Sequence, residues 1–421
     1  MAAESQNARC QRACKLSMFS IVFLDMIGVG IVIPTLAVLF LETDMSILPV
    51  TFTFSMRTVL YGLLIAVYPL MQFFGAPILG ALSDRHGRKK MLLLSISGTL
   101  AGYILFAIGI MTRDLSLLFI GRMIDGFTGG NISIASSAIA DISDKKSKAR
   151  NFGMIGMAFG FGFIIGPFLG GHLSNPALVS WFNLSTPFWF AAALTIFNMF
   201  LLVSIFPETL KTRVNTRISP FTGFRSINRA FRMPSLRIMF LVIFILGFGF
   251  NFYTQFGQVF LIEKFHFTQV DIGNYFAYTG FWIAFAQGAI TRPLSRRFSP
   301  PKVLRFSIVL LGLTLPMLLI PTQAIYLFLI TPFMAIFQGL TYPNSTAIVS
   351  NLSDEKSQGE ILGINQSIQS LAQAIPPLIA GFIASIDYTL PIVVASICTI
   401  AGWLIFIAFF GKKRHEPFHE V

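Results

Sequence analysis

Three ionisable side chains lie within long apolar stretches of this 421-residue chain: Asp25, Arg122 and Asp125. An ionisable group inside a membrane costs several kcal/mol unless it is paired or reached by water, so each is a candidate functional residue. A carboxyl group that can be reached from each side in turn could take up and release a proton. Arg122 and Asp125 stand three residues apart, so they can pair on one helix face. These three residues are the candidate proton-coupling group.

Asp25 is the first choice for the proton-exchanging carboxyl. It has no cation nearby on its own segment, so burial favours its neutral form, whereas Arg122 favours the ionised form of Asp125. At about 1.5 Å per helical residue, Asp25 lies roughly 12 Å from the end of its helix and Arg122 and Asp125 roughly 22–27 Å from theirs. We therefore expect no direct contact between Asp25 and Arg122. Two alternatives stay open: a static Arg122–Asp125 ion pair, and an Asp25 bonded only to backbone or water.

Neutral polar side chains form stripes along other apolar segments. Asn251, Gln255 and Gln258 follow an i, i+4, i+7 spacing, which places them on one helix face. Such a stripe faces away from lipid, so it either joins helices or lines a wet cavity. The candidate cavity residues are Gln72, Asn251, Gln255, Gln258, Gln287, Gln338, Tyr342, Asn365 and Gln369.

The composition is that of a protein surrounded by lipid. Hydrophobic residues make up 54% and charged residues 12% of the chain, about half the charge of a soluble domain. The net charge of +13 is therefore no sign of a nucleic-acid partner. Three cysteines imply neither a disulfide framework nor a zinc site. With no catalytic triad, metal cluster or nucleotide-binding loop in the sequence, we expect neither an enzyme nor a metal or other cofactor.

Twelve apolar segments are long enough to cross a bilayer as helices, which predicts an all-α polytopic membrane protein. Pro and Gly within them are tolerated, because neighbouring helices satisfy the freed backbone groups. The segments are 17–41, 58–82, 91–111, 116–140, 152–174, 187–206, 237–262, 272–294, 304–321, 325–350, 360–384 and 391–410.

Lys and Arg predict the orientation. One set of connections carries 27 of the 31 Lys and Arg residues and the other set only three, so the first set is cytoplasmic, as are both termini. A basic connection at the centre divides the chain, and Leu82-Ser83 and Leu294-Ser295 occupy equivalent places in the two halves. The predicted organisation is a tail (1–16), a six-helix bundle (17–206), a linker (207–236), a pseudo-symmetric six-helix bundle (237–410) and a tail (411–421).

The loop from Gly80 to Lys90 has the most specific pattern in the chain. It reads Gly-Ala-Leu-Ser-Asp-Arg-His-Gly-Arg-Lys-Lys, a tight turn in which Asp84 can cap a helix or pair with Arg. It resembles the signature between helices 2 and 3 of the major facilitator superfamily, where this loop acts as a conformational latch. The resemblance assigns Gly80, Asp84, Arg85, Gly87 and Arg88 to this gating motif. In the second half Arg296 stands in place of Asp84.

The fifth segment is rich in glycine, which lets helix backbones pack closely in lipid. Its Gly-Pro-x-x-Gly-Gly sequence also resembles the antiporter signature of the same superfamily, found mostly in exporters. Generic close packing is the alternative interpretation. The residues concerned are Gly156, Gly160, Gly166, Pro167, Gly170 and Gly171.

Further matches resemble the tetracycline-resistance efflux proteins and related drug–proton antiporters. They include Leu24-Asp25, Gly121-Arg122, Ala140-Asp141 and Pro207-Glu208-Thr209. The sequence departs from those proteins where they carry a transport His in helix 8 and an Asp in helix 9. Ile283 and Leu311 stand there, although Gln287 is kept, and Asp125 stands where the relatives have a small residue.

The resemblance implies two bundles around a central cavity, with alternating access driven by a proton gradient. Export of a small amphiphilic drug or metabolite is the first expectation. Proton-coupled uptake of a nutrient such as an amino acid or siderophore is the second, and a non-transport sensor or scaffold is the third. The expected partners are protons, a small-molecule substrate and the lipid bilayer. We expect a monomer in the inner membrane of a bacterial cell.

Overall fold

The structure is a computed structural model that describes residues 2–42, 47–142, 148–210, 225, 228–229, 231–233, 236–352 and 358–410. Most of the predicted linker 207–236 and the tail 411–421 lie outside these residues. Within the described ranges the regular structure is helical throughout, as the apolar pattern predicts.

The chain forms two compact units. The first comprises Met1–Thr222 with Phe267–Gly280, and the second comprises Gly223–His266 with Phe281–Val421. The first unit holds α1 (Ala2–Leu41), α2 (Phe54–His86), α3 (Arg88–Thr112), α4 (Leu115–Thr128), α5 (Asn131–Asp141), α6 (Lys148–Leu173), α7 (Thr186–Ile205) and most of α10 (Gln269–Phe285). The second holds α9 (Arg237–Phe265), the end of α10, η1 (Ala286–Ile290), α11 (Thr291–Ser295), α12 (Pro300–Met317), α13 (Ala324–Asn351), α14 (Gln358–Ile386) and α15 (Leu390–Phe410).

The twelve predicted segments correspond to these helices, with two interruptions. Segment 116–140 is divided into α4 and α5 by a turn at Gly129 and Gly130, and segment 272–294 is interrupted by one π-helical turn, η1. Eight helices are long and apolar enough to cross a membrane uninterrupted, and α6 adds a shorter apolar stretch, Gly160–Leu173. The chain is therefore a multi-pass membrane protein in which two spans are interrupted.

Side chains that satisfy the first backbone N–H groups mark several helix starts. Thr53 accepts from the Met56 N–H at 3.3 Å before α2, and Asp114 accepts from the Ser116 N–H at 2.8 Å before α4. Thr268-Gln269-Val270-Asp271 forms a capping box at the start of α10. The Asp271 carboxylate accepts from the Thr268 N–H at 3.0 Å, and the Asp271 N–H faces the Thr268 hydroxyl at 3.4 Å.

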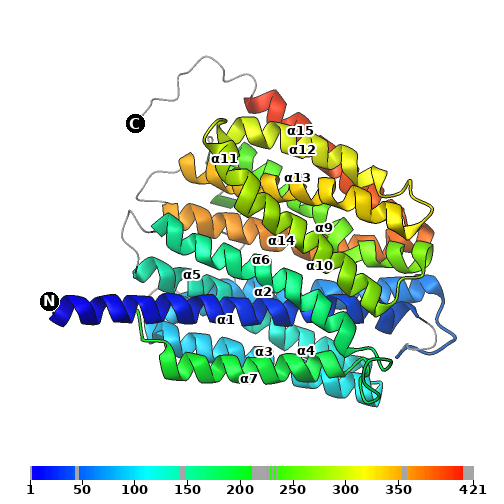
Figure 1. Cartoon of the computed structure of the whole chain (residues 1–421), viewed down its shortest axis with the longest axis horizontal. Helices are drawn as coiled ribbons and strands as arrows, with labels where there is room; N and C mark the ends of the chain where they lie inside the picture. Colours follow the sequence, from blue (N-terminus) through cyan, green and yellow to red (C-terminus); the bar gives the residue numbers. More distant parts are fainter. Residues whose placement is uncertain are drawn as a thin grey trace. The chain divides into compact units, whose positions relative to one another are not determined.

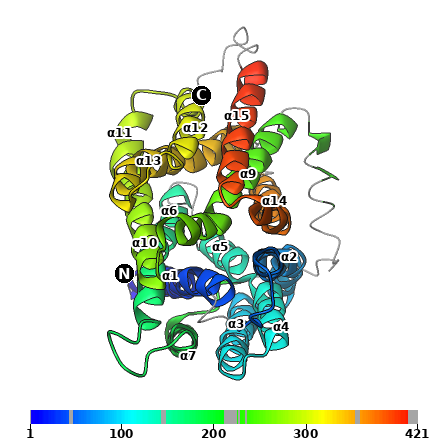
Figure 2. The same cartoon turned by 90° about the vertical axis from the view of Figure 1, so that its right-hand side faces the viewer.

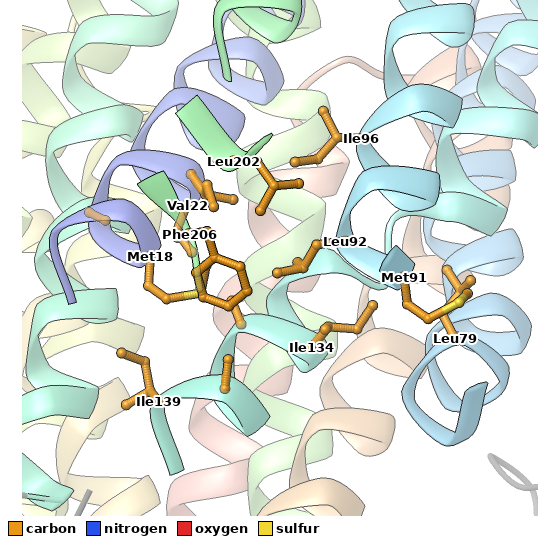
Figure 3. Close-up of a cluster of buried hydrophobic side chains, with 14 of the residues drawn as sticks. Met18, Val22, Leu79, Met91, Leu92, Ile96, Ile134, Ile139, Leu202 and Phe206 are labelled. Carbon is orange, nitrogen blue, oxygen red and sulfur yellow. The ribbon is translucent and has the colours of Figure 1, made fainter. Parts of the chain in front are cut away.

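In the first unit α1 packs along α6, and α4 packs against both α2 and α3 (Figures 1 and 2). An apolar cluster fills the space where α1, α2, α3, α5 and α7 meet. Figure 3 shows Met18 and Val22 of α1 beside Leu92 of α3 and Leu202 of α7, with Phe206 among them. This cluster fixes the helices that carry Asp25 and the loop after α2.

In the second unit α9 packs against α14 and α15, and α12 against α13 and α15. Its apolar core includes Phe240 and Ile243 of α9, Ile308 of α12 and Ile364 of α14. The polar stripe of α9 begins beyond this core along the same helix.

Candidate functional site

The turn between α4 and α5 brings polar groups into the interior of the first unit. The Thr128 carbonyl accepts from the Gly130 N–H at 2.7 Å within the turn, and side chains of neighbouring helices bind the carbonyls of both Thr128 and Gly129. The Gln72 amide of α2 donates to the Gly129 carbonyl at 2.8 Å, and the Ser95 hydroxyl of α3 donates to the Thr128 carbonyl. Gln72 was predicted to line a cavity, and in the structure its amide binds the turn between α4 and α5.

Asp25 lies on α1 beside this turn. It lies within electrostatic range of Asp125 of α4, near Asn131 at the start of α5. Asp25 is of intermediate exposure, whereas Asp125 has 6% of its surface exposed.

The two carboxyls share two aromatic neighbours in the first unit. Both act electrostatically on Tyr68 of α2 and Tyr103 of α3. A Cβ added at Gly28, one turn after Asp25, would collide with the Tyr103 hydroxyl group.

The spacing of Arg122 and Asp125 permits an ion pair, but these two described side chains are not paired within 4.0 Å. The described side chains that are paired include those of Arg88 with Asp84 and Asp141. The Arg122 guanidinium instead lies over the rings of Tyr68 and Phe106, 5.5 and 5.3 Å from their centroids, and its Nε has no hydrogen-bond partner.

Asp125 packs against α3, where a Cβ at Gly102 would lie 2.7 Å from the Asp125 Cβ. The one-turn spacing from Arg122 permits a pair, but the side chains turn toward different neighbours. Arg122 still acts on Asp125 through its charge at longer range.

The loop between α2 and α3 forms a network of charged groups. Gly87 has φ of 105°, a conformation that favours glycine, and it ends α2 directly before α3. Arg88 pairs with Asp84 at 2.5 Å and with Asp141 at the end of α5 at 3.0 Å, and it donates to the Ser83 hydroxyl at 2.6 Å. The sequence pattern left open whether Asp84 caps a helix or pairs with an arginine, and the structure shows the pair.

Glu208 completes this network and was not among the predicted gating residues. Its carboxylate accepts from the Arg88 N–H at 2.9 Å and the Lys89 N–H at 3.1 Å, so it caps α3. A Cβ at Gly87 would lie 2.5 Å from Glu208 Oε2. The Pro207-Glu208-Thr209 match is the signal in the sequence that could have identified it. Of the other motif residues, Arg85 is exposed, and Gly80 has ordinary space beside Ser133.

The glycines of α6 pack on the backbone of α1. A Cβ at Gly166 would lie 2.7 Å from the Gly30 Cα, and one at Gly170 would meet the Ile31 carbonyl. Gly171 faces Gln269 at the start of α10, which belongs to the same unit. Pro167 lies within α6 and Gly160 is of intermediate exposure, while the surroundings of Gly156 lie outside the described side chains.

The polar residues predicted to line a cavity in the second unit differ in their surroundings. Gln255 donates to Asn251 Oδ1 at 2.9 Å and to the Gln373 carbonyl at 3.4 Å, so it joins α9 to α14. The Tyr342 hydroxyl donates to Gln369 Oε1 at 2.9 Å, and Tyr342 is 50% exposed.

The other four residues that were predicted to line a cavity in the second unit lie in α9, α14, η1 and α13. Gln258 and Asn365 are buried, and the side-chain oxygen of each has no hydrogen-bond partner in the described part of the chain. Gln287 is exposed on η1, and Gln338 is partly exposed on α13.

The chain has apolar spans that contain carboxyl groups, a capped and ion-paired loop between α2 and α3, and two helices packed closely through glycines. Together these features are those of a secondary transporter of the membrane. The family comparison agrees. The Major Facilitator Superfamily model matches residues 18–295 and 276–420, and the chain belongs to this superfamily.

Two curated relatives and one solved structure are similar over most of the chain. Tetracycline resistance protein class C of Escherichia coli is 31% identical, over 85% of this chain and 86% of the relative. Multidrug resistance protein 1 of Bacillus subtilis is 28% identical, over 92% of this chain and 94% of the relative. The human organic anion transporter MFSD10 has a TM-score of 0.73 at 21% identity, over 94% of this chain and 99% of that one, which supports the fold.

Proposed function

We propose that this transporter exports a small amphiphilic drug or metabolite in exchange for protons. The observation that carries the proposal is the placement of two carboxyls, Asp25 and Asp125, inside the first unit of a membrane-spanning chain. A buried acid with a partly accessible surface can exchange a proton, and its change of charge can alter which helix arrangement is stable. Asp25 is the proton-exchanging residue in this proposal, and the charge of Asp125 acts on it.

The direction and the kind of solute rest on the relatives. Two bacterial proteins of similar length are named for tetracycline and multidrug resistance. Uptake by symport would use the same carboxyls, but the solved transporters of that kind are similar at identities that support the fold alone. We further propose that the chain acts in a bacterial inner membrane as a monomer, with no cofactor beyond the proton gradient and no covalent step.

The role of the charged loop follows from its contacts. Arg88 joins the ends of α2 and α5, and Glu208 joins the chain after α7 to α3. We propose that this network stabilises one arrangement of the cytoplasmic ends of the first unit. Its loss should therefore change how fast the protein passes between states rather than how tightly it holds solute.

The test is uptake of a fluorescent lipophilic dye into inverted membrane vesicles, measured with and without an imposed pH gradient. Gradient-dependent accumulation that is absent from vesicles without the protein supports export by proton exchange. Accumulation that is unchanged when the gradient is collapsed would refute proton coupling.

A further inference from the structure

Four cationic side chains lie close together along the chain at the cytoplasmic start of α12, in the second unit. Two follow α11 directly and two belong to the first turns of α12, and all four are exposed. Among the described side chains, none of the four takes part in an ion pair. We call this set the α12 cationic patch: Arg296, Arg297, Lys302 and Arg305.

The equivalent loop of the first unit has a different charge balance. There Arg88 pairs with Asp84 and Asp141. The offset between the two halves places Arg296 where Asp84 stands and Pro300 where Arg88 stands. The second copy of the loop has thus lost both partners of the Asp84–Arg88 ion pair and keeps exposed cations. Cations that no protein carboxylate neutralises are available to an anion from outside the protein.

One face of α12 continues from the patch into the membrane. The exposed residues that follow Lys302 at spacings of four, four, three and four are Phe306, Leu310, Leu313 and Met317. These spacings place them on one side of the helix, and the opposite side packs in the apolar core of the second unit. The exposed face therefore presents cations first and an apolar surface after them, in the same order as the head group and acyl chains of a phospholipid.

Trp403 of α15 lies beside the patch. Its indole N–H donates to the Arg305 carbonyl at 3.0 Å, and α15 packs against α12 (Figures 1 and 2). Trp is enriched where a membrane meets water, because its ring is apolar and its N–H group is polar. The hydrogen bond therefore indicates that Arg305 lies at the level of the lipid head groups.

We propose that the α12 cationic patch binds the phosphate of an anionic phospholipid of the cytoplasmic leaflet, whose acyl chains lie along the exposed face of α12. Clusters of four or more Lys and Arg beside a spanning helix attract anionic lipids, and each charge near the surface contributes about fivefold to the affinity. The attraction between exposed charges weakens as the salt concentration rises. A zwitterionic phospholipid has no net charge and binds the patch more weakly.

The experiment measures lipid binding to the purified full-length protein in detergent by native mass spectrometry. The probes are phosphatidylglycerol and phosphatidylcholine with the same acyl chains. Arg297→Gln/Lys302→Gln removes two charges from exposed side chains, so the protein should keep its fold. We expect its affinity for phosphatidylglycerol to fall about 25-fold, while phosphatidylcholine binding stays unchanged. Arg297→Lys/Lys302→Arg keeps both charges and should bind the two lipids as the wild type does.

Arg85→Gln/Lys90→Gln is the matched control. These two exposed residues occupy the equivalent positions in the first unit, where Asp84 and Glu208 supply negative charge. The carboxylates already reduce the attraction of this loop for anions. The control should therefore change the affinity for phosphatidylglycerol by less than about threefold, below the roughly fivefold contribution of one unopposed charge.

Three results would overturn the proposal: an unchanged affinity for phosphatidylglycerol in Arg297→Gln/Lys302→Gln, an equal fall in the control, or equal binding of both lipids by the wild type. The last of these would mean that only ordinary surrounding lipid occupies this face. Sodium phosphate distinguishes a lipid from a free anion. If it displaced phosphatidylglycerol more strongly than sodium chloride of the same ionic strength, the site would take free phosphate and the lipid assignment would fail.

Discussion

Gly166→Ala tests the close packing of α6 on α1. The added Cβ would lie 2.7 Å from the Gly30 Cα, 2.7 Å from the Ile27 carbonyl oxygen and 3.0 Å from the Gly30 carbonyl carbon. Non-bonded carbons prefer separations of about 3.5–4.0 Å, so the helices must separate by roughly 1 Å. All three neighbours are backbone atoms that cannot rotate away. Overpacking of this kind costs about 1–3 kcal/mol.

The assay is thermal unfolding of purified protein followed by retention of the folded peak in size-exclusion chromatography. Gly257→Ala is the matched control in α9, because its Cβ would lie 3.4 Å from the Tyr253 ring, an ordinary contact. We expect Gly166→Ala to lower the melting temperature, while Gly257→Ala stays within about 0.5 kcal/mol of the wild type.

Gly30→Ala should resemble Gly166→Ala, since its Cβ would lie 2.9 Å from the Gly166 Cα. The double variant should cost less than the sum of the two, because both changes act on one contact. A Gly166→Ala protein as stable as the wild type would refute this crossing of α1 and α6.

Three other predictions concern the loop network and the topology. Asp84→Asn should slow dye transport while solute affinity, measured by thermal stabilisation with ligand, stays near that of the wild type; a loss of affinity with normal turnover would contradict the gating role. Glu208→Ala removes the acceptor for two N–H groups of α3 and should lower the free energy of unfolding by about 1–2 kcal/mol; a normal melting temperature would contradict it. Reporter fusions should place the 207–236 connection, the Arg88 loop and the C-terminal tail in the cytoplasm, and an external signal at any of them would overturn the helix count.

The sequence predicts the helices because length and apolar composition alone determine what can cross a bilayer. It does not predict the turn that separates α4 from α5. Glycine is common within membrane helices, so Gly129-Gly130 does not mark a helix end in the sequence. The side chains that satisfy the freed carbonyls, Gln72 and Ser95, come from other helices and become recognisable only in three dimensions.

The candidate site shows the same limit. Charge within an apolar segment identifies Asp25, Arg122 and Asp125, because desolvation makes such residues rare. Which groups they contact depends on helix tilt and rotation, so the sequence left open an Arg122–Asp125 pair that the structure does not form.

Transport by Asp25→Asn in proteoliposomes, with and without an imposed pH gradient, tests the central claim most directly. We expect the variant to fold and to bind the dye, but to lose gradient-driven transport because Asn cannot exchange a proton. Asp125→Asn, measured in parallel, shows whether the other buried carboxyl carries the coupling instead. Full gradient-driven transport by Asp25→Asn would contradict the assignment of Asp25 as the proton-exchanging residue.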